Sequence, residues 1–132
     1  MKVWVNGTFD VLHIGHMKLL EYASTFGTVR VGIDSDERVR QKKGKDRPFN
    51  TLEDRMEFMN GIKYVDSVVS FNSDESLIDC IKNWNTDILV IGGDYEYKQI
   101  IGVEFVEKVY FFNKIENKST SKILSYDSNR NR

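Results

Sequence analysis

The chain has 132 residues, enough for one domain with its own core and too few for two ordinary domains. Apolar residues make up 40% of it, and 19 basic residues nearly balance 20 acidic ones, for a formal net charge of -1. This composition disfavours disorder, and it excludes a broad positive surface for nucleic acid or for an anionic membrane.

The cysteine count and the hydropathy pattern both predict a cytoplasmic location. Cys80 is the single cysteine, so no intrachain disulfide can form, and its apolar, helix-like surroundings favour a packing role. No apolar run approaches the roughly 18 to 20 residues that span a bilayer, and the amino terminus lacks the basic and apolar regions of a signal peptide. We therefore expect neither a membrane nor a nucleic acid as partner.

Short β-rich runs alternate with helix-like segments along the chain. The expected strands cover residues 2–6, 28–34, 66–71, 87–93 and 107–113. The expected helices cover 17–26, 51–62, 75–84 and 119–126, and a charged loop is expected over 40–50. This alternation, with nearly continuous apolar strands, predicts a doubly wound α/β fold, in which helices cover both faces of a mostly parallel five-stranded sheet.

A single domain is expected over residues 1–126, followed by a polar tail at 127–132 that shows no periodicity. In a doubly wound fold, the ligand lies at the carboxyl ends of the strands, near a switch in strand order. The first of these strand ends leads into residues 7–16, and this segment holds both histidines of the chain.

The segment at 7–16, "GTFDVLHIGH", predicts a phosphate-binding site. Gly7 ends the first strand where a ligand can approach the backbone, and Gly15 lies between His13 and His16. Helical spacing of three residues puts both imidazoles on one face at a helix start, where free N–H groups and the helix dipole favour an anion. Each piece alone also fits an ordinary turn glycine or a surface histidine, so the prediction depends on their coincidence.

This segment resembles the signature of the cytidylyltransferase-like nucleotidyltransferases, whose HxGH element contacts nucleotide phosphates, and residues 13–16 match it in full. The resemblance extends from Val3 to Leu124. It implies a Rossmann-like nucleotidyltransferase fold and a reaction that joins a phosphorylated alcohol to the α-phosphate of a nucleoside triphosphate, with release of pyrophosphate. It also implies that His13 and His16 are catalytic as hydrogen-bond donors to the reacting phosphate and the leaving group, and not as bases.

A basic segment, "QKKGKDRPFNTLEDR", is similar to the family's basic loop and the helix that follows it. The resemblance places Lys43 or Lys42 near the phosphates and makes Arg55 a second cationic contact. Without the histidine segment, such a charge run would be typical of a solvated loop. Mg²⁺ is expected to be carried by the triphosphate, because the sequence shows no carboxylate cage and hence no protein-bound metal.

Two further segments resemble nucleotide-contacting parts of the family. "VIGGDY" is similar to the nucleotide-facing turn, and "STSK" at 119–122 is similar to a helix start that holds the triphosphate, although Ser119 fits an ordinary N-cap equally well. Besides Lys42, the nucleotide contacts that the resemblance implies are Gly7, Thr8, Phe9, Gly92, Gly93, Asp94, Ser119, Thr120 and Ser121.

Asp10 and Lys114 are the candidates for contact with the acceptor. Asp10 either positions the acceptor or caps a helix, and the sequence leaves both open. Lys114 stands where glycerol-3-phosphate cytidylyltransferases commonly carry arginine, and a lysine matches a phosphate less well than a bidentate guanidinium.

Two substrate pairs fit the resemblance. "GKDRPFNTLEDR", "YVDSVVSF" and "VIGGDY" are most similar to adenylyltransferase domains that make ADP-heptose from heptose 1-phosphate and ATP, and we prefer this pair. The compact length and "GTFDVLHIGH" suit glycerol-3-phosphate cytidylyltransferases, which use CTP to make CDP-glycerol. A nucleotide-binding module without turnover is the alternative of another class, disfavoured because both histidines and the basic segment are present. The resemblance leaves a homodimer open.

Overall fold

A parallel sheet of five strands forms the centre of the computed structural model, which describes residues 1–93 and 100–112. The strand order is β3-β2-β1-β4-β5, and each neighbouring pair is parallel. The first three strands therefore run from the centre of the sheet to one edge, and the last two lie on the other side of the first strand. The strands are β1 (Lys2–Gly7), β2 (Thr28–Asp34), β3 (Ser67–Phe71), β4 (Ile88–Gly92) and β5 (Lys108–Phe112).

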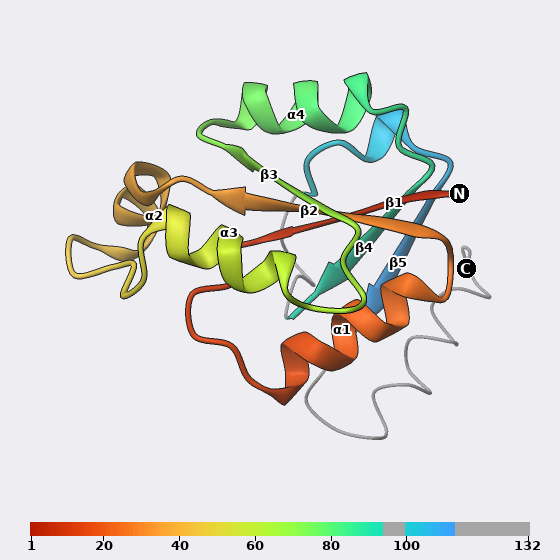
Figure 1. Ribbon diagram of the computed structural model, residues 1–132. Coiled ribbons are helices and arrows are strands. Elements are labelled where there is room, and N and C mark those ends of the chain that lie inside the picture. Colours follow the sequence, from red (N-terminus) through yellow and green to blue (C-terminus); the bar gives the residue numbers. More distant parts are fainter. Residues whose placement is uncertain (94–99, 113–132) are drawn as a thin grey trace.

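Helices cover both faces of this sheet (Figure 1). On one face lie α1 (Ile14–Ser24) and α3 (Leu52–Asn60), and on the other lie α4 (Asp74–Asn83) and the short 3-10 turn η1 (Val103–Phe105). The predicted doubly wound fold is therefore confirmed. None of the described helices combines the length and apolar composition needed to cross a bilayer.

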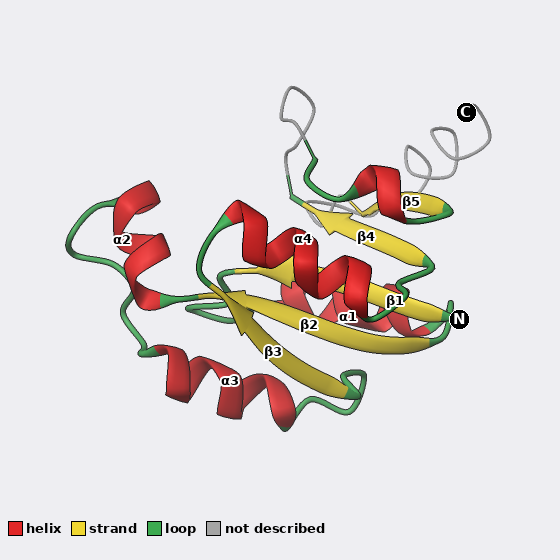
Figure 2. Cartoon of the chain, turned by 90° about the horizontal axis from the view of Figure 1, so that it is seen from above, coloured by secondary structure: helices red, strands yellow, loops and turns green. Residues whose placement is uncertain are grey.

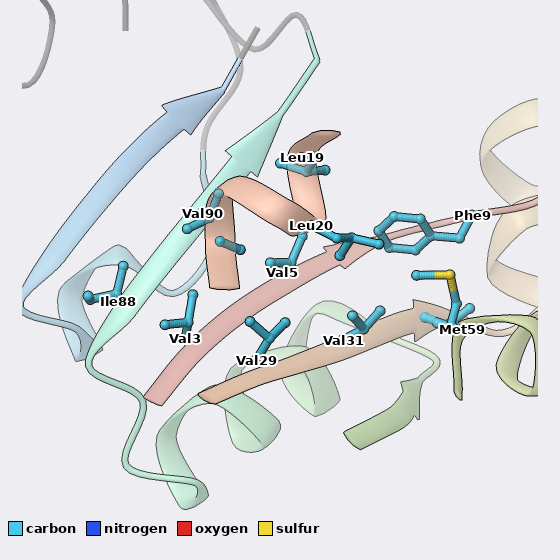
Figure 3. Close-up of a cluster of buried hydrophobic side chains, with 12 residues drawn as sticks. Val3, Val5, Phe9, Leu19, Leu20, Val29, Val31, Met59, Ile88 and Val90 are labelled. Carbon is cyan, nitrogen blue, oxygen red and sulfur yellow. The ribbon is translucent and has the colours of Figure 1, made fainter. Parts of the chain in front are cut away.

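Side-chain alternation along the strands divides the core into two clusters. Val3 and Val5 point to the α1 side and belong to one cluster with Leu20 and Met59 (Figure 3). Trp4 points to the opposite side and packs in the cluster that α4 covers. Because successive strand residues face opposite ways, an apolar run such as "VWV" supplies both cores at once.

The charged stretch that was expected as a loop over 40–50 contains the end of a helix, so that expectation was wrong in part. Helix α2 (Asp36–Lys43) extends beyond the carboxyl end of β2, as Figures 1 and 2 both show. The Ser35 hydroxyl is the N-cap and accepts a hydrogen bond from the Arg38 amide. Two acidic residues lie in the first turn of the helix, and three basic residues lie in its last turn. This charge order suits the helix dipole, and local capping favours a helix in spite of high polarity.

The other expected elements lie within a few residues of the observed ones, and the largest difference is at α1. It begins at Ile14 instead of residue 17, because His13 serves as its N-cap. The expected helix at 119–126 and the expected tail at 127–132 lie outside the described residues. The domain boundary at residue 126 therefore stays a prediction.

Candidate active site

A pocket of about 130 Å³ opens at the carboxyl ends of β1 and β4. These two strands are neighbours, and the strand order reverses between them, which is where open α/β sheets bind ligands. Six of the predicted site residues line the pocket together with three that the sequence did not single out. The lining residues are Asn6, Gly7, Thr8, Phe9, His16, Leu19, Gly92, Gly93 and Phe112.

The two histidines close the first turn of α1 with their own side chains. Nδ1 of His13 accepts from the Gly15 amide at 3.0 Å, and Nδ1 of His16 accepts from the His13 amide at 3.1 Å. The two rings lie 4.1 Å apart between centroids. A neutral imidazole that accepts at Nδ1 carries its proton on Nε2, so the capping geometry makes the Nε2 atom of each ring a hydrogen-bond donor.

The turn after β1 has an unusual backbone. Phe9 is buried and has a positive φ of 51°, which a bulky residue rarely adopts. A Cβ at Gly7 would lie 3.1 Å from the Phe9 ring, so Gly7 is needed for the ring as well as for an open pocket. The Phe9 ring also meets the His16 ring edge-on at 5.6 Å between centroids. Local packing therefore fixes both this turn and the His16 ring beside the pocket.

The two candidate lysines lie on the other side of the histidine turn from the glycines of β4. Lys42 and Lys43 are exposed in the last turn of α2, beyond the end of β2, and neither lines the pocket. Burial raises the pKa of Asp34, at the end of β2, although the charges of Arg38, Lys42, Lys43 and Arg55 act to lower it. The lysines are thus close enough to this edge of the sheet to influence a carboxyl group there.

Arg55 lies inside the protein in this structure, and its predicted contact with the triphosphate stays a prediction. Its side chain is fully buried, and its guanidinium makes four hydrogen bonds within the protein. Nε donates to the Asn50 carbonyl at 3.0 Å, and Nη1 donates to the carbonyls of Thr8 at 3.0 Å and Asp34 at 2.8 Å. Nη2 donates to the Asp36 carboxylate at 2.6 Å. No sequence signal separates such a buried arginine from a phosphate ligand.

Asp10 holds the loop before α3 and does not cap a helix. Its carboxylate accepts from the amides of Phe49 at 2.6 Å and Asn50 at 2.8 Å, and the Asn50 side chain donates back to the Asp10 carbonyl at 2.7 Å. Burial raises the pKa of Asp10, but these hydrogen bonds and the Arg55 charge lower it by more, so its pKa lies below the ordinary aspartate value. The carboxylate therefore stays ionised and bonded.

Several predicted contacts lie outside the described residues, namely Asp94, Lys114, Ser119, Thr120 and Ser121. Conversely, Asn6, Leu19 and Phe112 line the pocket without having been predicted. Asn6 lies near the carboxyl end of β1, and Phe112 ends β5, which pairs with β4 on the side away from β1. Both positions could have been identified once the strand order was known.

His16 lines this glycine-rich pocket and His13 does not. An imidazole with Nε2 as donor in such a pocket suits the transfer of a phosphate-containing group, where positioning and charge outweigh the need for a base. Together with the doubly wound fold, this defines the nucleotidyltransferase class. A family model described as Cytidylyltransferase-like matches residues 4–127. The chain therefore belongs to the cytidylyltransferase-like family, which confirms the predicted family and the enzyme class.

Similar proteins agree with this assignment. The chain is 43% identical over 123 residues to "Bifunctional protein HldE" of Helicobacter hepaticus, covering 92% of this chain and 25% of that protein. The protein of the same name from Sulfurimonas denitrificans is also 43% identical over 123 residues, covering 92% and 26%. The chain thus spans about a quarter of the length of these relatives.

A solved structure shares the fold. It is described as the lipopolysaccharide core biosynthesis protein from Thermoplasma volcanium GSS1, and it superposes with a TM-score of 0.70 at 23% identity. The match covers 83% of this chain and 93% of that one. The same architecture is therefore known from experiment.

Proposed function

We propose that this domain transfers an adenylyl group from ATP to a sugar 1-phosphate, most specifically a heptose 1-phosphate, with release of pyrophosphate. The observation that carries the proposal is the placement of His16 and the Gly7–Phe9 turn in one pocket with Gly92 and Gly93, at the switch point of the sheet. The similarity to the HldE proteins supports the sugar-phosphate acceptor, as does the resemblance of "GKDRPFNTLEDR" and "VIGGDY" to ADP-heptose-forming domains.

The chemistry needs donors rather than a strong base. An oxygen of the acceptor phosphate, already ionised near neutral pH, attacks the α-phosphorus of the triphosphate. The new bond from that oxygen to phosphorus forms as the bond to the bridging oxygen of pyrophosphate breaks, and pyrophosphate leaves with the electron pair. Nε2–H groups of His13 and His16 stabilise the charge on the reacting phosphate and the leaving group in our proposal.

Cations would neutralise the leaving pyrophosphate. Lys43, or its neighbour Lys42, is proposed to contact the phosphates from the end of α2. Mg²⁺ would be carried by the triphosphate and would screen its charge. Among the described residues, no group of three or more His, Cys, Asp or Glu side chains could hold a metal ion.

CTP with glycerol 3-phosphate is the second candidate. It is favoured by the full match of His13–His16 and by the family description, Cytidylyltransferase-like. The two candidates share the phosphate chemistry and differ in the base and in the acceptor. Asp94 and residues 119–121 stay predicted contacts of the nucleotide, and Lys114 stays a predicted contact of the acceptor.

A pyrophosphate-release assay across a substrate panel tests the proposal. ATP and CTP would each be paired with heptose 1-phosphate and glycerol 3-phosphate, with Mg²⁺ and with EDTA in parallel. We expect pyrophosphate and ADP-heptose from ATP with heptose 1-phosphate, and loss of product in EDTA. Product from CTP and glycerol 3-phosphate alone would reverse the order of the two candidates. Nucleotide binding without product from any pair would favour a non-catalytic module.

A homodimer and a cytoplasmic location stay predictions. An apolar hollow between α1 and α3, lined in part by Leu12, Met17, Phe58 and Ile62, supplies a surface that suits a second copy. The side chain of Phe58 is exposed at its edge. Sedimentation velocity would show twice the chain mass of 15.4 kDa for a dimer.

A further inference from the structure

We propose that Arg55 is a positioning residue that holds the basic end of α2 and the histidine turn in one fixed arrangement. The inference rests on the proposed function, because it assigns both segments to the same reaction. It replaces the direct phosphate contact that the sequence predicted for Arg55.

The four acceptor residues of the Arg55 guanidinium come from three separate parts of the chain. Thr8 belongs to the turn after β1, Asp34 ends β2, Asp36 begins α2, and Asn50 belongs to the loop before α3. We call these four residues and Arg55 the Arg55 network. Arg55 itself is fully buried, and its bond to the Asp34 carbonyl is buried on both sides and protected from competing water.

Two members of the Arg55 network set the orientation of α2. The Asp34 carbonyl and the Asp36 carboxylate, on either side of the N-cap, both accept from Arg55. The helix has eight residues and is therefore about 12 Å long, so a tilt at its first turn displaces its last turn. That last turn carries Lys42 and Lys43, and Arg55 thereby controls where their charges lie.

Asn50 joins this arrangement to the histidine turn a second time. Its carbonyl accepts from Arg55, while its amide and side chain bond to Asp10, six residues before His16. The turn after β1 is therefore held on one side by the Thr8 carbonyl and on the other by Asp10. The buried Arg55 guanidinium is thus bonded both to the segment that carries the histidines and to the helix that carries the lysines.

The substitution Asp36→Ala separates positioning from direct contact by the sign of its effect. If Arg55 bound phosphate, removing its carboxylate partner would free the guanidinium and strengthen triphosphate binding. If Arg55 positions α2, the same change loosens the helix and lowers kcat/KM by about tenfold, equal to one lost interaction of about 1.4 kcal/mol. Asp36→Asn keeps an oxygen acceptor and should recover part of the loss.

The matched control is Glu37→Ala, which removes the neighbouring charge from the same helical turn. Glu37 is exposed and takes no part in the Arg55 network. We expect kcat/KM to stay within about twofold of wild type in this variant. An increase in kcat/KM for Asp36→Ala, or equal losses in Asp36→Ala and Glu37→Ala, would overturn the proposal.

Hydrogen exchange supplies a readout that needs no activity. In Arg55→Lys, one ammonium cannot reach acceptors in four directions, so the amides of Phe49 and Asn50 and those of α2 should exchange at least about tenfold faster. Unchanged exchange at these amides in both Arg55→Lys and Asp36→Ala would overturn the positioning role. If the wild-type protein transferred no nucleotide, the proposed function would fail, while the exchange result would still decide the structural claim. If Arg55→Lys did not fold, Asp36→Ala would carry both measurements.

Discussion

At the level of single residues, each of the two imidazoles has a structural task, and we propose a chemical task for each as well. Nδ1 of each ring accepts a backbone amide of the first turn of α1, which leaves the proton of a neutral ring on Nε2. The capping geometry therefore orients both imidazoles with Nε2 as the donor atom.

Substitution of one imidazole tests this double role. His16→Ala should lower turnover by about 10² to 10³, the usual effect of removing one aimed donor. It should also cost about 1 kcal/mol of stability, because the His13 amide loses its acceptor. Steady-state kinetics and a thermal melt measure the two effects separately. Lys18→Ala, on the exposed side of the same helix, is the control, and turnover of His16→Ala within about threefold of wild type would refute the donor role.

At the level of elements, a charged side chain, that of Asp10, holds the loop that leads into α3. The loop before α3 bonds to the Asp10 carboxylate through two consecutive amides. These bonds lower the pKa of Asp10 against the opposing effect of burial. Since the folded-state pKa lies below the unfolded one, this carboxylate stabilises the fold above the ordinary aspartate range, and the contribution is lost as the pH falls through the folded-state pKa.

Asp10→Asn is therefore expected to destabilise the protein in a pH-dependent way. At pH 7 the free energy of unfolding should fall by about 1.5 to 3 kcal/mol, the value of hydrogen bonds to a charged group. The difference from wild type should shrink as the pH falls below the ordinary aspartate pKa of about 3.9 and through the lower folded-state pKa of Asp10, so the second measurement is made in acid below that range. Urea unfolding at both pH values measures it, with Asp46→Asn in the exposed part of the same loop as control. A difference independent of pH would contradict the assignment.

At the level of the whole molecule, the strand order determines what lies beside the pocket. Because β1 is central, β2 with the basic helix lies on one side of the histidine turn and β4 with its glycines on the other. Close packing between the side chains of β1 and the backbone of β2 holds these two central strands together. Trp4 of β1 is fully buried against Gly32 of β2, whose missing side chain makes room for the indole.

Gly32→Ala should therefore weaken the whole fold. A Cβ at this position would lie 2.2 Å from the Trp4 ring, so the indole or the strand has to move. Such overpacking costs about 1 to 3 kcal/mol, and the melting temperature should fall by several degrees. Gly61→Ala is the control, because φ is negative there and the nearest atom would lie at 3.4 Å. Equal melting temperatures for the two variants would show that the sheet yields at Gly32.

The sequence by itself determined the doubly wound fold, the family and the position of the histidine turn, because these depend on local periodicity, capping and spacing. It predicted six of the residues that line the pocket. Only the tertiary structure showed the hydrogen-bond partners of Arg55 and Asp10, since a charged residue in a polar stretch has the same local pattern whether it binds a ligand or a backbone group. The partners of Arg55 lie up to 47 residues away along the chain, and folding alone brings them together.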